Sequence, residues 1–314
     1  MLIFFTIYCK KFHPLTKGYQ GSYNVATMDH HKLNHKEIDN MLGAIIGDIV
    51  GSIYEFRNIK TKDFDFMPKQ TFFTDDSVMT IAIGKALLES NEDYSDLEKR
   101  VVKDMVSIGI MYPGSGYGRM FYHWLFRDQT PYGSYGNGAP MRVSACGIVG
   151  QTLEEVKELS HIVTGVSHNH PESYKAAEAT AVSVFLARQG MDKVELMQYV
   201  QKHYYPLDFT CDGIRETYKF DPTAQGTTPQ ALQAFFESTD FENAIRIAIS
   251  IGGDSDTLAA ITGAVAEAYY GIPHKWAQLA KQKLTPQLKR ILHDFHQQYP
   301  TCITDKQDPI QNLL

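Results

Sequence analysis

The alternation of apolar and polar residues from Met41 onward predicts a chain built of helices. In the first apolar segment, large aliphatic residues recur at spacings of three and four, as one buried face of a helix requires. Glycines fall between them on a neighbouring line, so we expect this helix to pack closely against others. The aliphatic positions are Leu42, Ile45, Ile46, Ile49 and Ile53, and the glycines are Gly43, Gly47 and Gly51.

Three further apolar segments continue this pattern. They run from Ser77 to Leu88, from Ala176 to Arg188 and from Leu258 to Tyr270, where Gly271 and Pro273 follow as stop signals. Alternating runs of Val, Ile and Thr that would mark strands are few. No linker-like stretch and no internal repeat interrupts residues 41–300. The prediction is an all-α fold with a single domain over residues 41–300.

The first 40 residues do not share this pattern. Met1 to Cys9 is apolar, but no basic residue precedes it and no small-residue cleavage site follows closely, which argues against a secretory signal. The stretch after it contains His30, His31 and His35 without a sustained period. We interpret residues 1–40 as a weakly ordered extension, or as a start upstream of the true one at Met28 or Met41. Residues 301–314 are expected to be a C-terminal tail.

Composition narrows the classes of function. The 314 residues include 36 acidic and 30 basic side chains, a net charge of -6, without a block of Lys and Arg, so nucleic acid is not expected as the primary partner. The four cysteines are widely spaced and form no C-x-x-C pair, which is typical of reduced thiols in a cytoplasmic protein. No apolar run reaches the roughly 20 residues that cross a bilayer. We expect a cytoplasmic monomer with no membrane partner.

Two acidic clusters stand out, Thr74-Asp75-Asp76-Ser77 and Gly252-Gly253-Asp254-Ser255-Asp256-Thr257, each at the start of an apolar helix. Either cluster alone is commonly a helix cap, because Asp, Ser and Thr are preferred there. Together they hold four carboxylates between apolar segments, where unpaired charges are costly. Hard cations such as Mg²⁺ or Mn²⁺ prefer such oxygen ligands, and two ions can share a bridging carboxylate. We therefore predict a site for two Mg²⁺ or Mn²⁺ ions.

Other polar residues are ambiguous when taken alone. Glu55 is expected at the end of the first helix, where an exposed glutamate needs no function. The Gly136-Asn137-Gly138 stretch reads as a turn, and glycine there also lets a backbone approach phosphates. His168 and His170 could form a poor metal pair, but a polar helix start is the commoner reading. The Gly-rich turn around Tyr117 needs no function either.

Seven stretches of the sequence resemble those of a known protein family and occur in the same order along the chain. The sequence resembles the ADP-ribosylglycohydrolases, which include dinitrogenase-reductase-activating enzymes and ADP-ribosyl-acceptor hydrolases, over nearly all of residues 41–275. Ser167, where threonine is common, is a small departure, as are Gly133 and Pro140. The matching stretches are GAIIGDIVGSIYEF, FFTDDSVMTIAIGKALL, YPGSGYGRMFYHWL, GNGAPMRVSACG, SHNHPES, AQGTTPQAL and IGGDSDTLAAITGAVAEAYYGIP.

The resemblance implies an orthogonal all-helical domain with two Mg²⁺ or Mn²⁺ ions in a central cleft, and it gives the residues above specific roles. Glu55 falls where members specific for O-linked ADP-ribose place a metal-proximal, mobile catalytic glutamate, and Asp76 and Asp256 are implied as further catalytic carboxylates. The metal ligands implied are Thr74, Asp75, Asp76, Asp254, Asp256 and Thr257. The residues implied to bind ADP-ribose are Gly136, Asn137, Gly138, Met141, His168 and Tyr117, with Arg142 in the same diphosphate-holding segment.

The function that the resemblance implies is hydrolysis of the bond between ADP-ribose and an acceptor, for which we expect ADP-ribosylated arginine on a protein. The alternative is a binding or immunity module that sequesters ADP-ribosylated protein or blocks an ADP-ribosyltransferase toxin. Some immunity-type relatives use an added N-terminal segment for this purpose. The complete set of metal ligands favours the enzyme.

Overall fold

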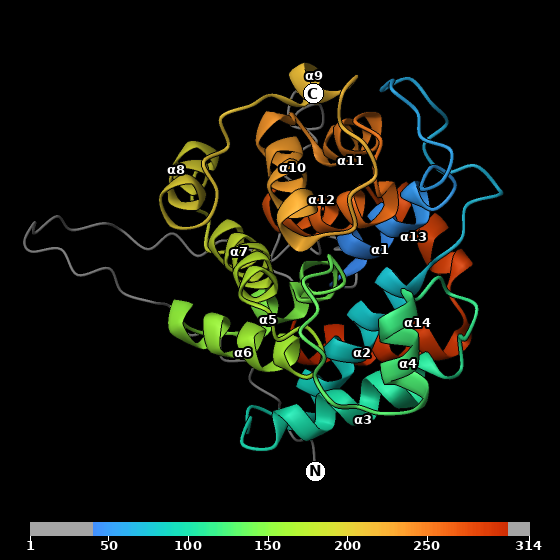
Figure 1. Ribbon diagram of the computed structural model, residues 1–314, viewed down its shortest axis with the longest axis vertical. Helices are drawn as coiled ribbons and strands as arrows, with labels where there is room; N and C mark the ends of the chain where they lie inside the picture. Colours follow the sequence, from blue (N-terminus) through green and yellow to red (C-terminus); the bar gives the residue numbers. More distant parts are fainter. Residues whose placement is uncertain (1–39, 301–314) are drawn as a thin grey trace, which may run out of the picture. The chain divides into compact units, whose positions relative to one another are not determined.

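The computed structural model describes residues 40–300 (Figure 1). Within this range the chain is helical, without a named strand, and an isolated bridge joins Gly136 to Thr223. The all-α prediction is confirmed. The proposed extension up to residue 39, the tail at residues 301–314, and the histidines and cysteines within them lie outside the described residues. The helices are α1 (Leu42–Gly51), α2 (Asp75–Ser90), α3 (Leu97–Gly109), α4 (Arg119–Phe126), η1 (Pro140–Arg142), α5 (Ser144–Val149), α6 (Leu153–Gly165), α7 (Pro171–Arg188), α8 (Lys193–His203), α9 (Cys211–Ile214), α10 (Ala224–Glu237), α11 (Phe241–Ser250), α12 (Ser255–Tyr270), α13 (His274–Lys283) and α14 (Pro286–Gln298).

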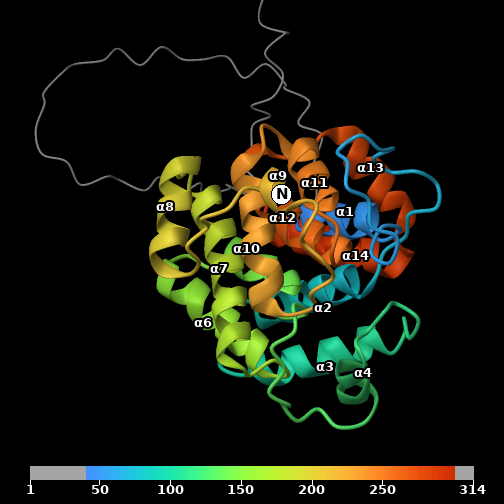
Figure 2. The ribbon, with the colours of Figure 1, turned by 45° about the horizontal axis from the view of Figure 1, so that its top comes forward.

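Helices α1 and α12 form the most extensive helix pair and lie side by side in both ribbon views (Figures 1 and 2). The glycines predicted to allow close packing lie in this contact. A Cβ on Gly47 would overlap the backbone of Ala259, and one on Gly43 would overlap the carbonyl oxygen of Gly263. Any larger residue would force the helices apart. This pairing brings the end of α1 beside the start of α12, where the second acidic cluster lies.

The start of α2 adds the first acidic cluster to this region. Thr74 caps the helix, and its hydroxyl accepts a hydrogen bond from the amide of Asp76. The predicted apolar segments lie within α2, α7 and α12, and α12 ends before Gly271 at a φ of 77°. One local prediction is wrong: α1 ends at Gly51, and the chain turns there, with the amide of Tyr54 donating to the Gly51 carbonyl. Glu55 therefore lies in a loop beyond the helix.

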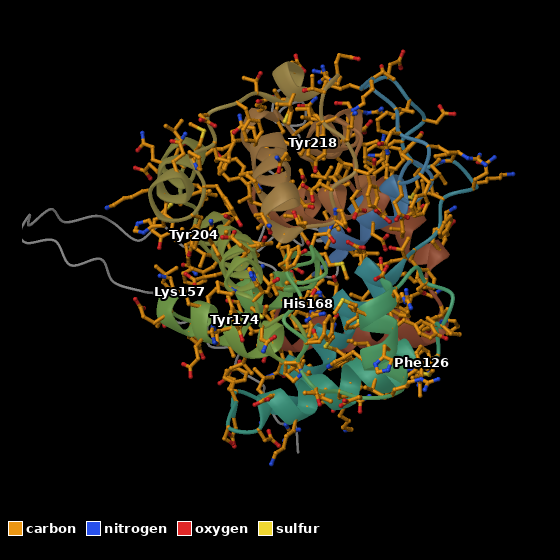
Figure 3. All side chains as sticks on the ribbon, in the orientation of Figure 1. Phe126, Lys157, His168, Tyr174, Tyr204 and Tyr218 are labelled. Atoms are coloured by element: carbon orange, nitrogen blue, oxygen red, sulfur yellow. The ribbon has the colours of Figure 1, made fainter. Side chains whose placement is uncertain are left out.

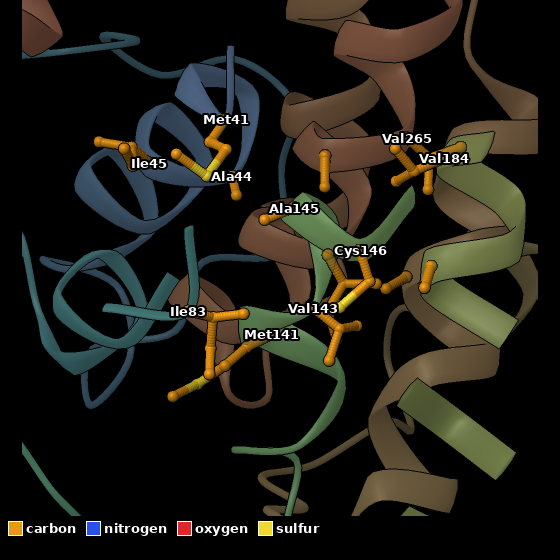
Figure 4. Packing of buried hydrophobic residues seen from close by; sticks show 14 of the residues in the cluster. Met41, Ala44, Ile45, Ile83, Met141, Val143, Ala145, Cys146, Val184 and Val265 are labelled. Carbon is orange, nitrogen blue, oxygen red and sulfur yellow. The ribbon is translucent and has the colours of Figure 1, made fainter. Parts of the chain in front are cut away.

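The buried segment formed by η1 and α5 packs against both α2 and α7. Figure 4 shows Met141, Val143 and Cys146 between Ile83 of α2 and Val184 of α7. Burial of these side chains fixes the preceding loop, residues 136–139, relative to the start of α2. No helix in the described range is both long and apolar enough to span a membrane.

Candidate active site

Acidic side chains from three elements converge where α1, α2 and α12 meet. Carboxylate oxygens of Asp48, Asp76 and Asp256 all lie within 4.8 Å of one another, and so do those of Glu55, Asp254 and Asp256. Asp256 belongs to both groups. Two overlapping groups of carboxylates that share one member could hold hard cations, because such ions prefer oxygen ligands.

Asp48 is a member of this cluster that the sequence analysis missed. It is fully buried in α1, and its Oδ2 accepts hydrogen bonds from the amides of Thr74 (2.9 Å) and Ser77 (3.0 Å) and from the Ser77 hydroxyl. Its Oδ1 accepts from the Thr74 hydroxyl at 2.6 Å. Asp48 thus ties α1 to the first turn of α2. The missed signal is a carboxylate inside an otherwise apolar helix, where burial requires a partner.

The threonines of the two clusters face the same carboxylates. The Thr257 hydroxyl donates to Asp76 Oδ2 at 3.3 Å, and the Thr74 hydroxyl lies 3.5 Å from that oxygen. The other oxygen of Asp76, Oδ1, is buried without a hydrogen-bond partner in the described chain. A buried carboxylate oxygen with no donor is costly, and a bound cation would satisfy it. Asp75 lies outside both close groups, although its amide is fixed by the Ser115 carbonyl at 2.7 Å.

The electrostatics of the cluster also favour cations. Burial raises the pKa of Asp48 to about 6 against the opposing effect of its hydrogen bonds, and burial with repulsion from Asp254 and Asp48 raises the pKa of Glu55 to about 7. Burial also raises the pKa of Asp254 and, with neighbouring carboxylates, that of Asp75, Asp76 and Asp256. Across the described residues no basic side chain forms a salt bridge with any of these six acids. Divalent cations would supply the missing positive charge.

The loop after α1 holds the Gly252-Gly253 turn that leads into α12. The Asn58 side chain accepts from the Gly253 amide and donates to the Gly253 carbonyl, both at 2.8 Å. The Lys60 ammonium donates to the carbonyls of Ile251 (2.6 Å) and Tyr218 (2.9 Å). Both glycines have positive φ, 72° and 77°, which favours glycine over residues with a side chain. This clamp fixes Glu55 and Asp254 relative to each other.

The glycine-rich loop contributes a side chain to the acidic cluster. The side-chain amide of Asn137 donates to Asp254 Oδ2 at 2.8 Å and to the Thr227 hydroxyl at 3.1 Å. The backbone amide of Asn137 donates to the Pro222 carbonyl. Asn137 therefore orients a carboxylate of the cluster. A Cβ on Gly138 would lie 3.1 Å from His168 Nε2, so glycine leaves room for that imidazole.

The other residues predicted to bind or support the substrate, Met141, Tyr117 and Arg142, are buried. Met141 is buried beneath the glycine-rich loop, and its amide donates to the Asn137 carbonyl. Tyr117 is buried with its hydroxyl donating to the Gly109 carbonyl in α3, so the hydroxyl is engaged within the fold. Arg142, expected in the diphosphate-holding segment, has no exposed surface.

Exposed aromatic rings border the cluster on loops that are distant in sequence. Phe56, next to Glu55, is 80% exposed and stacks on Phe220, which is 46% exposed, with ring centroids 6.1 Å apart. Tyr135, next to the glycine-rich loop, is 51% exposed. Large exposed rings of this kind are typical of contact surfaces. None of the three stands out in the sequence, because an isolated aromatic residue carries no signal of exposure.

Comparison with known proteins assigns the chain to a family. A model of the family described as ADP-ribosylglycohydrolase matches residues 31–302. The chain belongs to the ADP-ribosylglycohydrolase family. This membership confirms the predicted family and makes the protein an ADP-ribosyl-acceptor glycohydrolase by class.

Several curated relatives resemble this glycohydrolase at low identity over most of their length. ADP-ribosylhydrolase ARH3 of Xenopus tropicalis is 25% identical, covering 76% of this chain and 88% of the relative. ADP-ribosyl-[dinitrogen reductase] glycohydrolase of Rhodospirillum rubrum is 25% identical over 82% of this chain and 94% of the relative. ADP-ribosylarginine hydrolase Tri1 of Pseudomonas putida is 24% identical over 76% and 72%, respectively.

A solved structure titled "ADP-ribosylglycohydrolase-related protein complex" superimposes on the glycohydrolase with a TM-score of 0.58. It is 22% identical and covers 82% of this chain and 95% of the other. At this identity the likeness establishes the all-helical fold alone.

Proposed function

We propose that this protein hydrolyses the glycosidic bond between ADP-ribose and an arginine side chain of a modified protein, using two Mg²⁺ or Mn²⁺ ions. The observation that carries the metal dependence is the pair of carboxylate groups that share Asp256 and have no basic partner in the described chain. Family membership supports the reaction class. The name of the Pseudomonas relative supports arginine as the acceptor.

The ligands proposed for the two ions are Thr74, Asp75, Asp76, Asp254, Asp256 and Thr257, to which the structure leads us to add Asp48. The orphaned Oδ1 of Asp76 and the oxygen-only donor set fit a hard divalent cation. When bound, such ions supply Lewis-acid chemistry: they hold ribose hydroxyls and lower the pKa of a water.

Glu55 is proposed to accept the proton of the attacking water. The water oxygen forms a bond to the distal ribose C1, and the bond from C1 to the acceptor nitrogen breaks with its electron pair going to nitrogen. The acceptor nitrogen takes up the proton that Glu55 received, which returns the carboxylate to its starting state. Glu55 is half-buried and grouped with Asp254 and Asp256, so it can reach a water held at that position. Its loop position beyond α1 leaves the carboxylate free of helix constraints.

The other side of the site is proposed to hold ADP-ribose. His168 and the Gly136–Gly138 loop would contact the diphosphate and proximal ribose, with Tyr117 and Met141 supporting them from below. The exposed Phe56 and Phe220 rings, next to Glu55, would contact the polypeptide that carries the modified residue.

A turnover assay tests the proposal. Protein ADP-ribosylated on arginine, and a peptide ADP-ribosylated on serine, are incubated with the enzyme in EDTA and after addition of Mg²⁺ or Mn²⁺. We expect ADP-ribose release from the arginine substrate only with metal. Release from serine alone would reassign the acceptor. Tight binding without release in any metal would refute hydrolysis and favour a binding or immunity module.

A further inference from the structure

The most unusual charge outside the metal cluster is the guanidinium of Arg142. The residue is fully buried in η1, and no carboxylate forms a salt bridge with it among the described residues. Its Nε has no hydrogen-bond partner there. Burial lowers its pKa to about 10, which still leaves it cationic at neutral pH. Its Cζ lies over the Phe121 ring, 5.7 Å from the centroid, which gives the charge a cation–π contact, and its directed hydrogen bonds come from Nη2.

The Nη2 of Arg142 leads directly to His168. It donates to the Ser167 hydroxyl at 2.9 Å and weakly to the Val163 carbonyl at 3.4 Å. The same hydroxyl oxygen lies 2.8 Å from Nδ1 of His168. Arg142 has only donors, so the hydroxyl oxygen must accept from it. The hydroxyl proton is then free to be donated to Nδ1, which is its other contact.

The imidazole of His168 packs against two aromatic rings and meets the Ser167 hydroxyl at Nδ1, which leaves Nε2 for another partner. Its ring lies between the rings of Phe121 and Tyr132, with centroid distances of 6.1 and 5.7 Å. Burial, with a contribution from the Arg142 charge, lowers the pKa of His168 well below its usual value. Nε2 faces the glycine-rich loop, 3.1 Å from where a Cβ of Gly138 would lie. His168, labelled in Figure 3, is buried.

We infer that Arg142 and Ser167 are positioning residues that fix His168 as a neutral imidazole protonated on Nε2, so that it presents one hydrogen-bond donor to the space beside Gly136 and Gly138. Since a neutral ring carries one proton, a lone pair on Nδ1 places that proton on Nε2. The ligand of this donor is an oxygen of the ADP-ribose diphosphate or proximal ribose, which rests on the function proposed above.

The test compares two substitutions of Ser167, which follows the end of α6, with a control within α6. Ser167→Ala removes the bridging hydroxyl, and Ser167→Thr keeps it. Ser160→Ala removes a buried hydroxyl of α6 that bonds only to the Lys157 carbonyl. Each full-length protein is labelled with ¹⁵N-histidine, and His168 is assigned among the 12 histidines by its absence in His168→Gln. Imidazole ¹⁵N resonances report the tautomer and whether Nδ1 accepts a hydrogen bond.

In the wild type we expect an unprotonated, hydrogen-bonded Nδ1 and a proton on Nε2. Ser167→Ala should shift the Nδ1 resonance, weaken ADP-ribose binding by about three- to tenfold in calorimetry, and raise KM with kcat unchanged. Ser167→Thr and Ser160→Ala should leave all three at the wild-type values. A wild-type His168 protonated on Nδ1, or a Ser167→Ala protein with unchanged resonance and affinity, would overturn the inference.

The two proposals can fail separately. The ¹⁵N spectrum is recorded without ligand, so the expected tautomer in a protein that binds no ADP-ribose supports the relay and refutes the proposed function. Normal hydrolysis with His168 protonated on Nδ1 refutes the relay alone.

Discussion

Replacing Asp48 with asparagine separates the two tasks of this carboxylate, holding α2 and binding cations. Asparagine has nearly the same shape. Its amide oxygen can occupy the Oδ2 position, where it still accepts from the amides of Thr74 and Ser77 and from the Ser77 hydroxyl. Its NH₂ group then faces the Thr74 hydroxyl, which must turn to accept. We expect the hydrogen-bonded clamp between α1 and α2 to persist while the negative charge is lost.

The expected magnitudes follow from these contacts. Losing one carboxylate charge at the proposed metal site should weaken Mg²⁺ or Mn²⁺ binding by at least the roughly 10–100-fold, about 1.4–2.7 kcal/mol, that follows loss of a group which only supports a metal ligand. Without metal, the altered Thr74 contact costs about 1 kcal/mol, which the removal of one buried charge offsets. Asp48→Ala instead leaves two buried amides without an acceptor, at roughly 1–3 kcal/mol each. The metal-free Asp48→Ala protein should unfold at a temperature well below that of the metal-free Asp48→Asn protein.

Calorimetric metal titration and thermal unfolding at pH 8, with and without EDTA, measure both effects. Asp104→Asn is the control, because Asp104 is a fully buried acid of α3 paired with Lys85 and outside the metal-ligand groups. It should keep wild-type metal affinity. The reasoning is refuted if Asp48→Asn binds metal as tightly as the wild type, or if its metal-free form is as unstable as Asp48→Ala.

Four further outcomes are expected. Asp256→Ala removes the carboxylate shared by both groups, so its metal affinity in calorimetry should fall by more than roughly 100-fold. Turnover should be lost while the helical circular dichroism is retained. Full activity at low metal concentration would refute the proposed site. Glu55→Gln should keep metal and ADP-ribose affinity but slow single turnover by roughly 10²–10⁴-fold, and a loss below about tenfold would remove Glu55 from the chemistry. Without metal, the folded state raises the pKa of Asp48 to about 6 and that of Glu55 to about 7, so each group favours folding when it is protonated. As pH rises from about 4 through 7, the melting temperature in EDTA should therefore fall relative to that of the Mg²⁺-loaded protein. A constant difference between the two melting temperatures would contradict this. Phe220→Ala should raise KM for ADP-ribosylated protein but not for ADP-ribosylated free arginine. The control is Phe126→Ala, at an exposed residue of α4 (Figure 3), which should change neither KM value. Equal effects of Phe220→Ala on both substrates would exclude a contact with the polypeptide.

The sequence determined the elements that depend on neighbours three or four residues away. Periodic apolar positions predicted α2, α7 and α12, and the Thr74 cap and the glycine stop at Gly271 are local features. The glycine line of α1 correctly indicated a close helix contact. The order of the motifs was sufficient to identify the family, because the residues that resemble the family lie in continuous stretches. The exact end of α1 was less well determined, since a turn at Ser52 competes with continuing the helix.

Only the tertiary structure decided which side chains meet. Asp48 reaches partners 26 and 29 residues away, and Asn137 bonds to a carboxylate 117 residues away. The buried Arg142 contacts Ser167, a residue that the sequence marked only as a small departure. No local spacing encodes these pairs. They form because close packing of α1 on α12 and burial of η1 bring distant polar groups into the interior, where each must find a hydrogen-bond partner or a counter-charge.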